Sequence, residues 1–177
     1  FLQDGQQSQR YFRVRPGIGE PEVIADGLEA VRAPARLEIV RRSPAVLLDT
    51  CHNPHGAKAT VAALTESFAF SPLIVVLGMM ADKDVAGVLQ VLAEEATLVV
   101  CTTIPGTSRA LPATELAELA VGILGDERVR VAEALPEAID LAVQLADDAG
   151  PGAGILIAGS VYLAGAARAM LVGASTT

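Results

Sequence analysis

The sequence predicts an α/β fold in which helices cover both faces of a mostly parallel sheet that has one antiparallel edge strand. From residue 45 onward, short β-branched runs alternate with segments whose apolar residues have helical spacing. The strand runs are apolar throughout, as expected of strands buried on both faces. Apolar residues make up 51% of the 177 residues and charged residues 19%, which is enough for one domain with a substantial core.

The first 34 residues are predicted to precede this domain as a linker arm and a short helix. Residues 1–20 are polar, rich in Gln and Arg, and interrupted by Pro-Gly. Residues 21–31 have apolar residues at helical spacing and a proline in first position, which is typical of a helix start. We therefore expect the α/β domain to span residues 35–177.

The elements of the domain are predicted from a pair of strands onward. "RLEIVRR" and "AVLLD" are two short strands joined through Ser43-Pro44, and the first is the expected antiparallel edge strand. Further strands are expected over residues 73–78, 98–102, 128–132 and 154–159. Helices are expected over residues 54–68, 84–96, 112–124, 135–149 and 161–172. Right-handed crossovers between such units produce a parallel, Rossmann-like sheet.

Composition excludes several classes of protein. The net charge is −8, which argues against a nucleic-acid binder, although residues 1–43 hold seven arginines against six acidic residues. No apolar run approaches the ~18 residues of a membrane helix, and the chain does not begin like a signal peptide. Two cysteines do not make a disulfide framework in a chain of this size. We expect a cytoplasmic, monomeric protein that binds neither nucleic acid nor membranes.

Ligands of open parallel sheets bind beyond the carboxyl ends of the strands, where this sequence concentrates its polar groups. Both histidines, His52 and His55, follow the strand that ends at Asp49. No further histidine or cysteine pair completes a metal site, so no metal ligand is predicted. Two interpretations stay open. Asp49 and His52 either order the turn by hydrogen bonds, or they contact a ligand hydroxyl and a reacting group.

Other strand ends carry equally ambiguous groups. Gly159-Ser160 suits a carboxylate or phosphate, but Ser160 is equally well a helix cap. Arg36 is either a phosphate clamp or an exposed edge-strand charge, and Arg109 is as readily a surface residue as a functional one. Asp84 is interpreted as a helix cap. The chain has no P-loop motif and no glycine-rich dinucleotide fingerprint.

Five segments in this order carry a family resemblance: "PARLEIV", "AVLLDTCHNPHGA", "VLGMMADKDV", "SRAL" and "ILIAGSVYLAGAAR". Together they resemble the C-terminal domain of the folylpolyglutamate synthase / dihydrofolate synthase family, within the Mur ligase superfamily. The resemblance covers roughly residues 21–172. Two departures are Ala35, where the family usually has glycine, and Thr50-Cys51, where it usually has smaller residues.

The resemblance implies an ATP-dependent ligase that adds L-glutamate to dihydropteroate or to folates through an acyl phosphate. It implies that ATP and Mg²⁺ are held mainly by an N-terminal ATPase domain, joined in cis and absent from this chain. The fragment alone is therefore expected to be inactive. Two other functions stay open: a non-catalytic Rossmann-like binding module, and a Mur ligase of cell-wall precursor synthesis. The sequence does not separate the two folate activities.

The resemblance also implies roles for individual residues. Arg36 matches an arginine that reaches the ATP phosphates, and Asp49 an aspartate near the ribose. His52 matches a histidine close to the reacting groups, and Ser160 a serine that binds the incoming glutamate; Asn53 is expected to shape the loop. Asp82 and Lys83 lie on the same edge of the predicted sheet without an assigned role.

Overall fold

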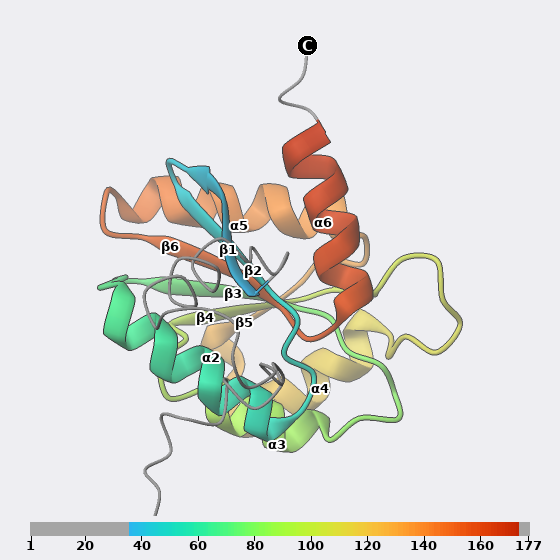
Figure 1. The fold of residues 1–177 in the computed structure, drawn as a ribbon. Coiled ribbons are helices and arrows are strands. Elements are labelled where there is room, and N and C mark those ends of the chain that lie inside the picture. The colour runs from blue at the N-terminus through green and yellow to red at the C-terminus, as the bar shows by residue number, and fades with distance from the viewer. Residues whose placement is uncertain (1–35, 174–177) are drawn as a thin grey trace, which may run out of the picture. The chain divides into compact units, whose positions relative to one another are not determined.

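The computed structural model describes residues 36–173, which form a six-stranded sheet between two layers of helices (Figure 1). The strand order is β1-β2-β6-β3-β4-β5. The strands are β1 (Arg36–Arg42), β2 (Ala45–Asp49), β3 (Leu73–Leu77), β4 (Leu98–Cys101), β5 (Val129–Val131) and β6 (Gly154–Ala158). The helices are α2 (Pro54–Ser67), α3 (Val85–Leu92), α4 (Ala113–Leu124), α5 (Leu135–Ala149) and α6 (Val161–Gly173), with a short 3₁₀ turn, η2 (Asp126–Arg128).

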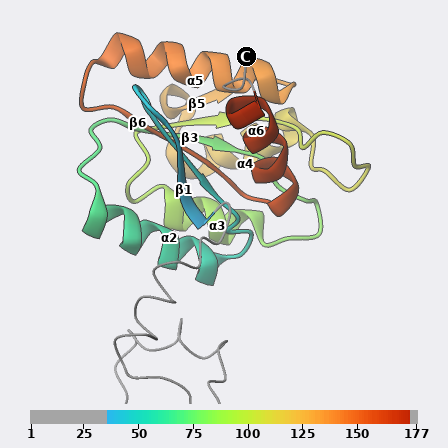
Figure 2. The same ribbon diagram turned by 45° about the horizontal axis from the view of Figure 1, so that its top comes forward.

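The predicted fold class is confirmed. The pairs β2–β6, β6–β3, β3–β4 and β4–β5 are parallel, and only the edge pair β1–β2 is antiparallel. Helices α2, α3 and α4 pack on one face of the sheet, and α5 and α6 on the other (Figure 2). The predicted arm and helix at residues 1–34 lie outside the described residues.

Every predicted element from β1 onward is present, and the largest boundary difference is at the end of α3. This helix was expected to reach residue 96 but ends at Leu92. The side chain of Arg128 donates hydrogen bonds to the carbonyl groups of Ala93, Ala96 and Thr97. These carbonyls belong to the turn after the helix, so a cation from a distant part of the chain stabilises the early helix end.

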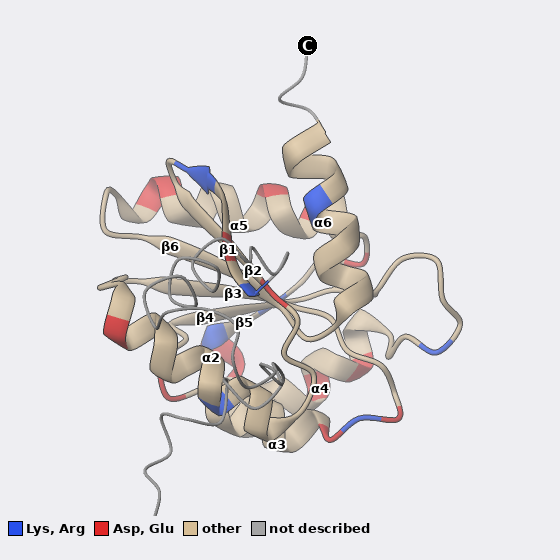
Figure 3. Ribbon diagram, in the orientation of Figure 1, with Lys and Arg blue, Asp and Glu red and all other residues tan. Residues whose placement is uncertain are grey.

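The middle of the sheet is apolar because its strands are buried on both faces. β3, β4 and β6 carry no charged residue (Figure 3). In β6, Leu156 packs with the cluster under α2, α3 and α4, whereas Ile155 and Ile157 pack with the cluster under α5 and α6. Apart from Asp49 at the end of β2, the charged groups of the described residues consequently lie on outer helix surfaces, edge strands and loops.

The chain leaves neighbouring strands in opposite directions at the carboxyl edge of the sheet. After β2 and β3 it enters α2 and α3 on one face, but after β6, which lies between them, it enters α6 on the other. Such a switch point opens a crevice between diverging loops. The fold therefore places a binding site at this edge.

Candidate functional site

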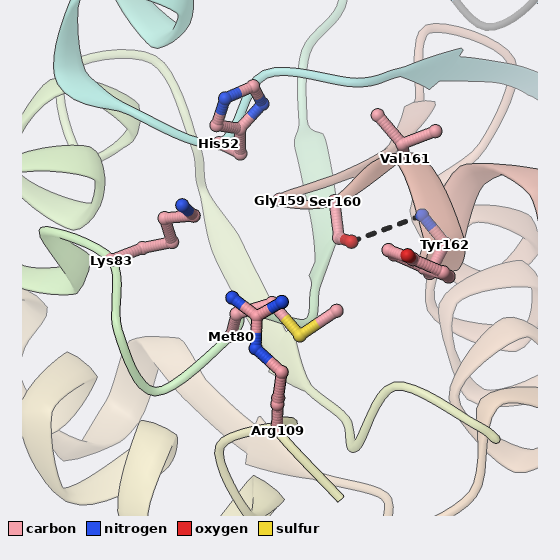
Figure 4. Close-up of a pocket in the computed structure, with 8 residues that line it drawn as sticks. All are labelled: His52, Met80, Lys83, Arg109, Gly159, Ser160, Val161 and Tyr162. Atoms are coloured by element: carbon pink, nitrogen blue, oxygen red, sulfur yellow. Dashed lines mark hydrogen bonds between the residues drawn. The ribbon is translucent and has the colours of Figure 1, made fainter. Parts of the chain in front are cut away.

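A pocket of about 180 Å³ lies at the switch point (Figure 4). It is lined by residues that follow four different strands: His52, Met80, Lys83, Arg109, Gly159, Ser160, Val161 and Tyr162. In the close-up, the polar ends of His52, Lys83, Arg109 and Ser160 surround one opening. The volume is below the roughly 300–1,000 Å³ of drug-sized ligand pockets and suits a ligand the size of an amino acid.

The structure brings together only some of the residues singled out from sequence. His52 and Ser160 line the pocket, whereas Arg36, Asp49 and Asn53 are not among its lining residues. Arg36 is exposed at the start of β1, and its backbone pairs with that of Asp49 at the end of β2.

The loop after β2 is ordered by the residues of its His-Asn-Pro motif. Asn53 caps α2, since its Oδ1 accepts a hydrogen bond from the Gly56 N–H at 2.8 Å, and Pro54 occupies the first turn. Nδ1 of His52 lies 3.0 Å from the carbonyl oxygen of Thr50. A carbonyl only accepts, so Nδ1 carries the proton and Nε2 of the neutral ring is left with the lone pair.

Asp49, the last residue of β2, orders the same loop. It is 7% exposed, and its Oδ1 accepts from the Cys51 N–H at 2.8 Å and lies 2.9 Å from the Thr60 hydroxyl. Its Oδ2 accepts from the Leu37 N–H at 3.1 Å. The turn-capping interpretation of Asp49 is therefore confirmed, while its contact with a ribose stays a prediction.

Ser160 and Gly159 form the opposite wall of the pocket. The hydroxyl of Ser160 accepts a hydrogen bond from the Tyr162 N–H at 3.1 Å, as a cap of α6, and the residue is 4% exposed. Gly159 has φ +112°, and a Cβ built on it would lie 2.4 Å from the carbonyl oxygen of Gly78. Only glycine fits where β6 passes so close to the end of β3.

The basic wall combines two loops that are far apart in sequence. Asp82 accepts from Arg109 at 2.9 Å and forms an ion pair with Lys83 at 3.2 Å. The hydrogen bonds from Lys83 and Arg109 lower the pKa of Asp82, which stays ionised. A backbone bond from the Ala81 N–H to the Arg109 carbonyl joins the two loops. The pairing of Arg109 with Asp82 is not evident from the sequence, because 27 residues separate the two.

The described residues contain neither a cluster of metal ligands nor a membrane-spanning helix. Between residues 36 and 173, no group of three or more His, Cys, Asp or Glu side chains is arranged to hold a metal ion. In the same part of the chain, no helix combines the length and apolarity needed to cross a lipid bilayer.

The two cysteines are expected to be unreactive in the folded protein. Cys51 and Cys101 are free and buried, and burial raises the pKa of each thiol from 9.0 to about 12. Only a thiolate reacts with iodoacetamide, so labelling at pH 8 should be slow in buffer and fast in urea. The folded state favours the protonated thiols, so their contribution to stability is present below pH 9 and is lost as the pH rises toward 12. Native thiols that label at pH 8 as fast as unfolded ones would contradict this prediction.

The fold and pocket together define the class of this protein: an α/β domain with a pocket at its switch point that is lined in part by basic side chains. The chain belongs to the family of Mur ligase glutamate ligase domains, whose model matches residues 35–161. The family expected from the sequence is confirmed.

Relatives and solved structures agree with this assignment. The chain is 42% identical over 159 residues to a dihydrofolate synthase/folylpolyglutamate synthase of Mycobacterium tuberculosis, covering 84% of this chain and 32% of the relative. A crystal structure of Mycobacterium tuberculosis folylpolyglutamate synthase, complexed with ADP and AMPPCP, matches with a TM-score of 0.82 at 43% identity, over 86% of this chain and 35% of that one.

A second crystal structure shows a related enzyme with an amino acid bound. It is a bifunctional folylpolyglutamate synthase/dihydrofolate synthase with Mn, AMPPNP and L-glutamate bound. It matches with a TM-score of 0.74 at 31% identity, over 86% of this chain and 35% of that one. The chain thus spans about a third of the length of these relatives.

Proposed function

We propose that this chain is the C-terminal domain of an ATP-dependent ligase that joins L-glutamate to dihydropteroate, to folates, or to both. The observation that carries the proposal is the basic pocket at the switch point, in a chain whose net charge is −8. A local cationic site in an acidic chain selects a small anion. The names of the relatives, and the solved relative with L-glutamate bound, support glutamate as that anion.

The incoming glutamate is placed in the pocket by its carboxylates. Lys83 and Arg109 are only partly neutralised by Asp82, because one carboxylate faces two cations. A ligand carboxylate adds the missing charge. Ser160 retains its own O–H as a donor, since its oxygen accepts from Tyr162.

His52 acts at the reacting amine. In the reaction that the family resemblance implies, ATP first converts the acceptor carboxylate into an acyl phosphate. The glutamate nitrogen then attacks its carbonyl carbon, a C–N bond forms, the C–O bond to phosphate breaks, and inorganic phosphate leaves. The attacking amine gives up one proton, and the free Nε2 of His52 is the group in the pocket that can accept it.

The remaining roles concern ATP and the missing part of the enzyme. Arg36 contacts the phosphates and Asp49 the ribose, and both face an ATPase domain joined in cis. As the family resemblance implies, Mg²⁺ would be held mainly by that ATPase domain. All steps assigned to this chain are binding, orientation and proton transfer.

The test is to measure ADP release by the full-length protein with L-glutamate and either dihydropteroate or tetrahydrofolate. We expect glutamate-dependent release, and the two acceptors separate the two activities. Lys83→Ala and Arg109→Ala should each raise the KM for glutamate about tenfold or more, because each removes one charge-assisted contact, while kcat changes less.

Arg130→Ala is the matched control. Arg130 donates only to the Glu127 and Val129 carbonyls near β5, away from the pocket, so its loss should leave the KM for glutamate unchanged. If glutamate does not stimulate ADP release by the wild-type protein with either acceptor, the ligase proposal is wrong. A non-catalytic binding module would give that result.

A further inference from the structure

The first residues of β1 adopt an unusual backbone conformation. Leu37 has φ +47°, in the left-handed region that disfavours a side chain such as leucine. The pairing of β1 with β2 shifts register between Arg36 and Glu38, on either side of this residue. An irregularity of this kind in an edge strand redirects the neighbouring side chain, here that of Arg36.

One buried carboxylate holds this conformation in place. Oδ2 of Asp49 accepts the Leu37 N–H, while Oδ1 accepts the Cys51 N–H and lies within hydrogen-bonding distance of the Thr60 hydroxyl. Asp49 thereby joins the start of β1 to the loop that carries His52. An ionised carboxylate can accept on both oxygens, which an amide cannot do.

Glu38, on the other side of the irregularity from Arg36, is also held in place. The Arg168 Nε on α6 lies 3.0 and 3.1 Å from the two carboxylate oxygens of Glu38. Leu37 therefore lies between Arg36 and Glu38, of which Glu38 is held by Arg168. The Leu37 N–H donates to Asp49. The direction in which Arg36 leaves the sheet depends on whether Leu37 keeps its left-handed conformation.

We propose that Asp49 is a positioning residue that aims Arg36 by holding Leu37 in the left-handed conformation. Through the same carboxylate, Asp49 keeps Arg36 in a fixed relation to the His52 loop. The inference rests on the role proposed above for Arg36 at the ATP phosphates, and it deepens that proposal. It assigns Asp49 an action through the backbone, in addition to any contact with a ribose.

The kinetic test compares three variants of the full-length protein. Asp49→Asn should raise the KM for ATP about tenfold, because the Leu37 N–H loses its charged acceptor. Thr60→Val is the matched control: it removes another partner of the same carboxylate but leaves Leu37 bonded, so the KM for ATP should stay near the wild-type value. Asp49→Asn combined with Leu37→Gly should recover most of the loss, because glycine adopts a positive φ without help.

A second nucleotide separates aiming from direct contact. The 2′,3′-dideoxy form of ATP has neither ribose hydroxyl. If Asp49→Asn raises the KM only because a ribose contact is missing, the variant and the wild type should have the same KM for this nucleotide. If the KM is raised because Arg36 is misplaced, Asp49→Asn should raise it for both nucleotides. A loss seen only with ATP, or no recovery on Leu37→Gly, overturns the proposal.

Hydrogen exchange tests the structural part without any activity. In the wild-type chain the Leu37 amide should exchange slowly, and Asp49→Asn should accelerate it about tenfold or more, with no such change in Thr60→Val. Rapid exchange in the wild type overturns the proposal even if Asp49→Asn does not fold. If the wild-type protein shows no ligase activity while Leu37 is protected as expected, the proposed function fails and the Asp49–Leu37 contact stands.

Discussion

Gly159→Ala is expected to lower the free energy of unfolding by about 3 kcal/mol or more. The backbone of Gly159 has φ +112°, which an L-residue rarely adopts. Its new Cβ would also lie 2.4 Å from the Gly78 carbonyl oxygen, a backbone atom at the end of a buried strand that cannot move aside cheaply. The loss is large against the roughly 5–15 kcal/mol of a typical domain. Urea unfolding of the wild type and the variant measures it.

Gly165→Ala is the matched control for this substitution. Gly165 lies within α6, and a Cβ built on it meets no atom within 4 Å. Alanine is the better helix former, so this variant should be more stable by about 0.5–1 kcal/mol. If both variants unfold at the wild-type urea concentration, the close approach of β6 and β3 does not constrain the domain as described.

His52→Ala is expected to lower the turnover of the full-length protein about 10²–10⁴-fold while leaving the fold intact. His52 is exposed, so its removal creates no cavity, but it takes away the Nε2 proposed to accept the proton of the attacking amine. Turnover with saturating ATP and glutamate measures the loss of catalysis, and thermal unfolding shows whether the fold is intact.

His55→Ala provides the comparison within the same loop. His55 is also an exposed histidine, but it lies in the first turn of α2 and does not line the pocket, so turnover should be unchanged. Arg36→Ala should lower turnover as His52→Ala does. Wild-type turnover in both His52→Ala and Arg36→Ala would remove these residues from the mechanism.

Local pattern predicted the elements of this fold but not the order of the strands. Strands such as "LIVVL" are buried on both faces, and all their residues are apolar for that reason, so they can be predicted from the sequence. Nothing in "GILIA" indicates that β6 lies between β2 and β3, because strand order depends on long-range packing. The early end of α3 depends on Arg128, which no local pattern near the helix reports.

The sequence predicted those residues of the candidate site that directly follow a strand, but not the pairings between distant loops. His52 and Ser160 each follow a strand, and the fold places both at one pocket. The pairing of Arg109 with Asp82 was missed, because a lone arginine in a Gly/Pro loop looks the same whether or not a distant carboxylate faces it. The roles of Arg36 and Asp49 at ATP stay predictions.

The central position of β6 has a consequence for how the protein is made. β2 and β3 are synthesised early, yet each pairs with β6 and not with the other. Residues 154–158 must therefore leave the ribosome before the two halves of the sheet can join. Until then, two rows of unpaired backbone groups on apolar strands are open to pairing with wrong partners.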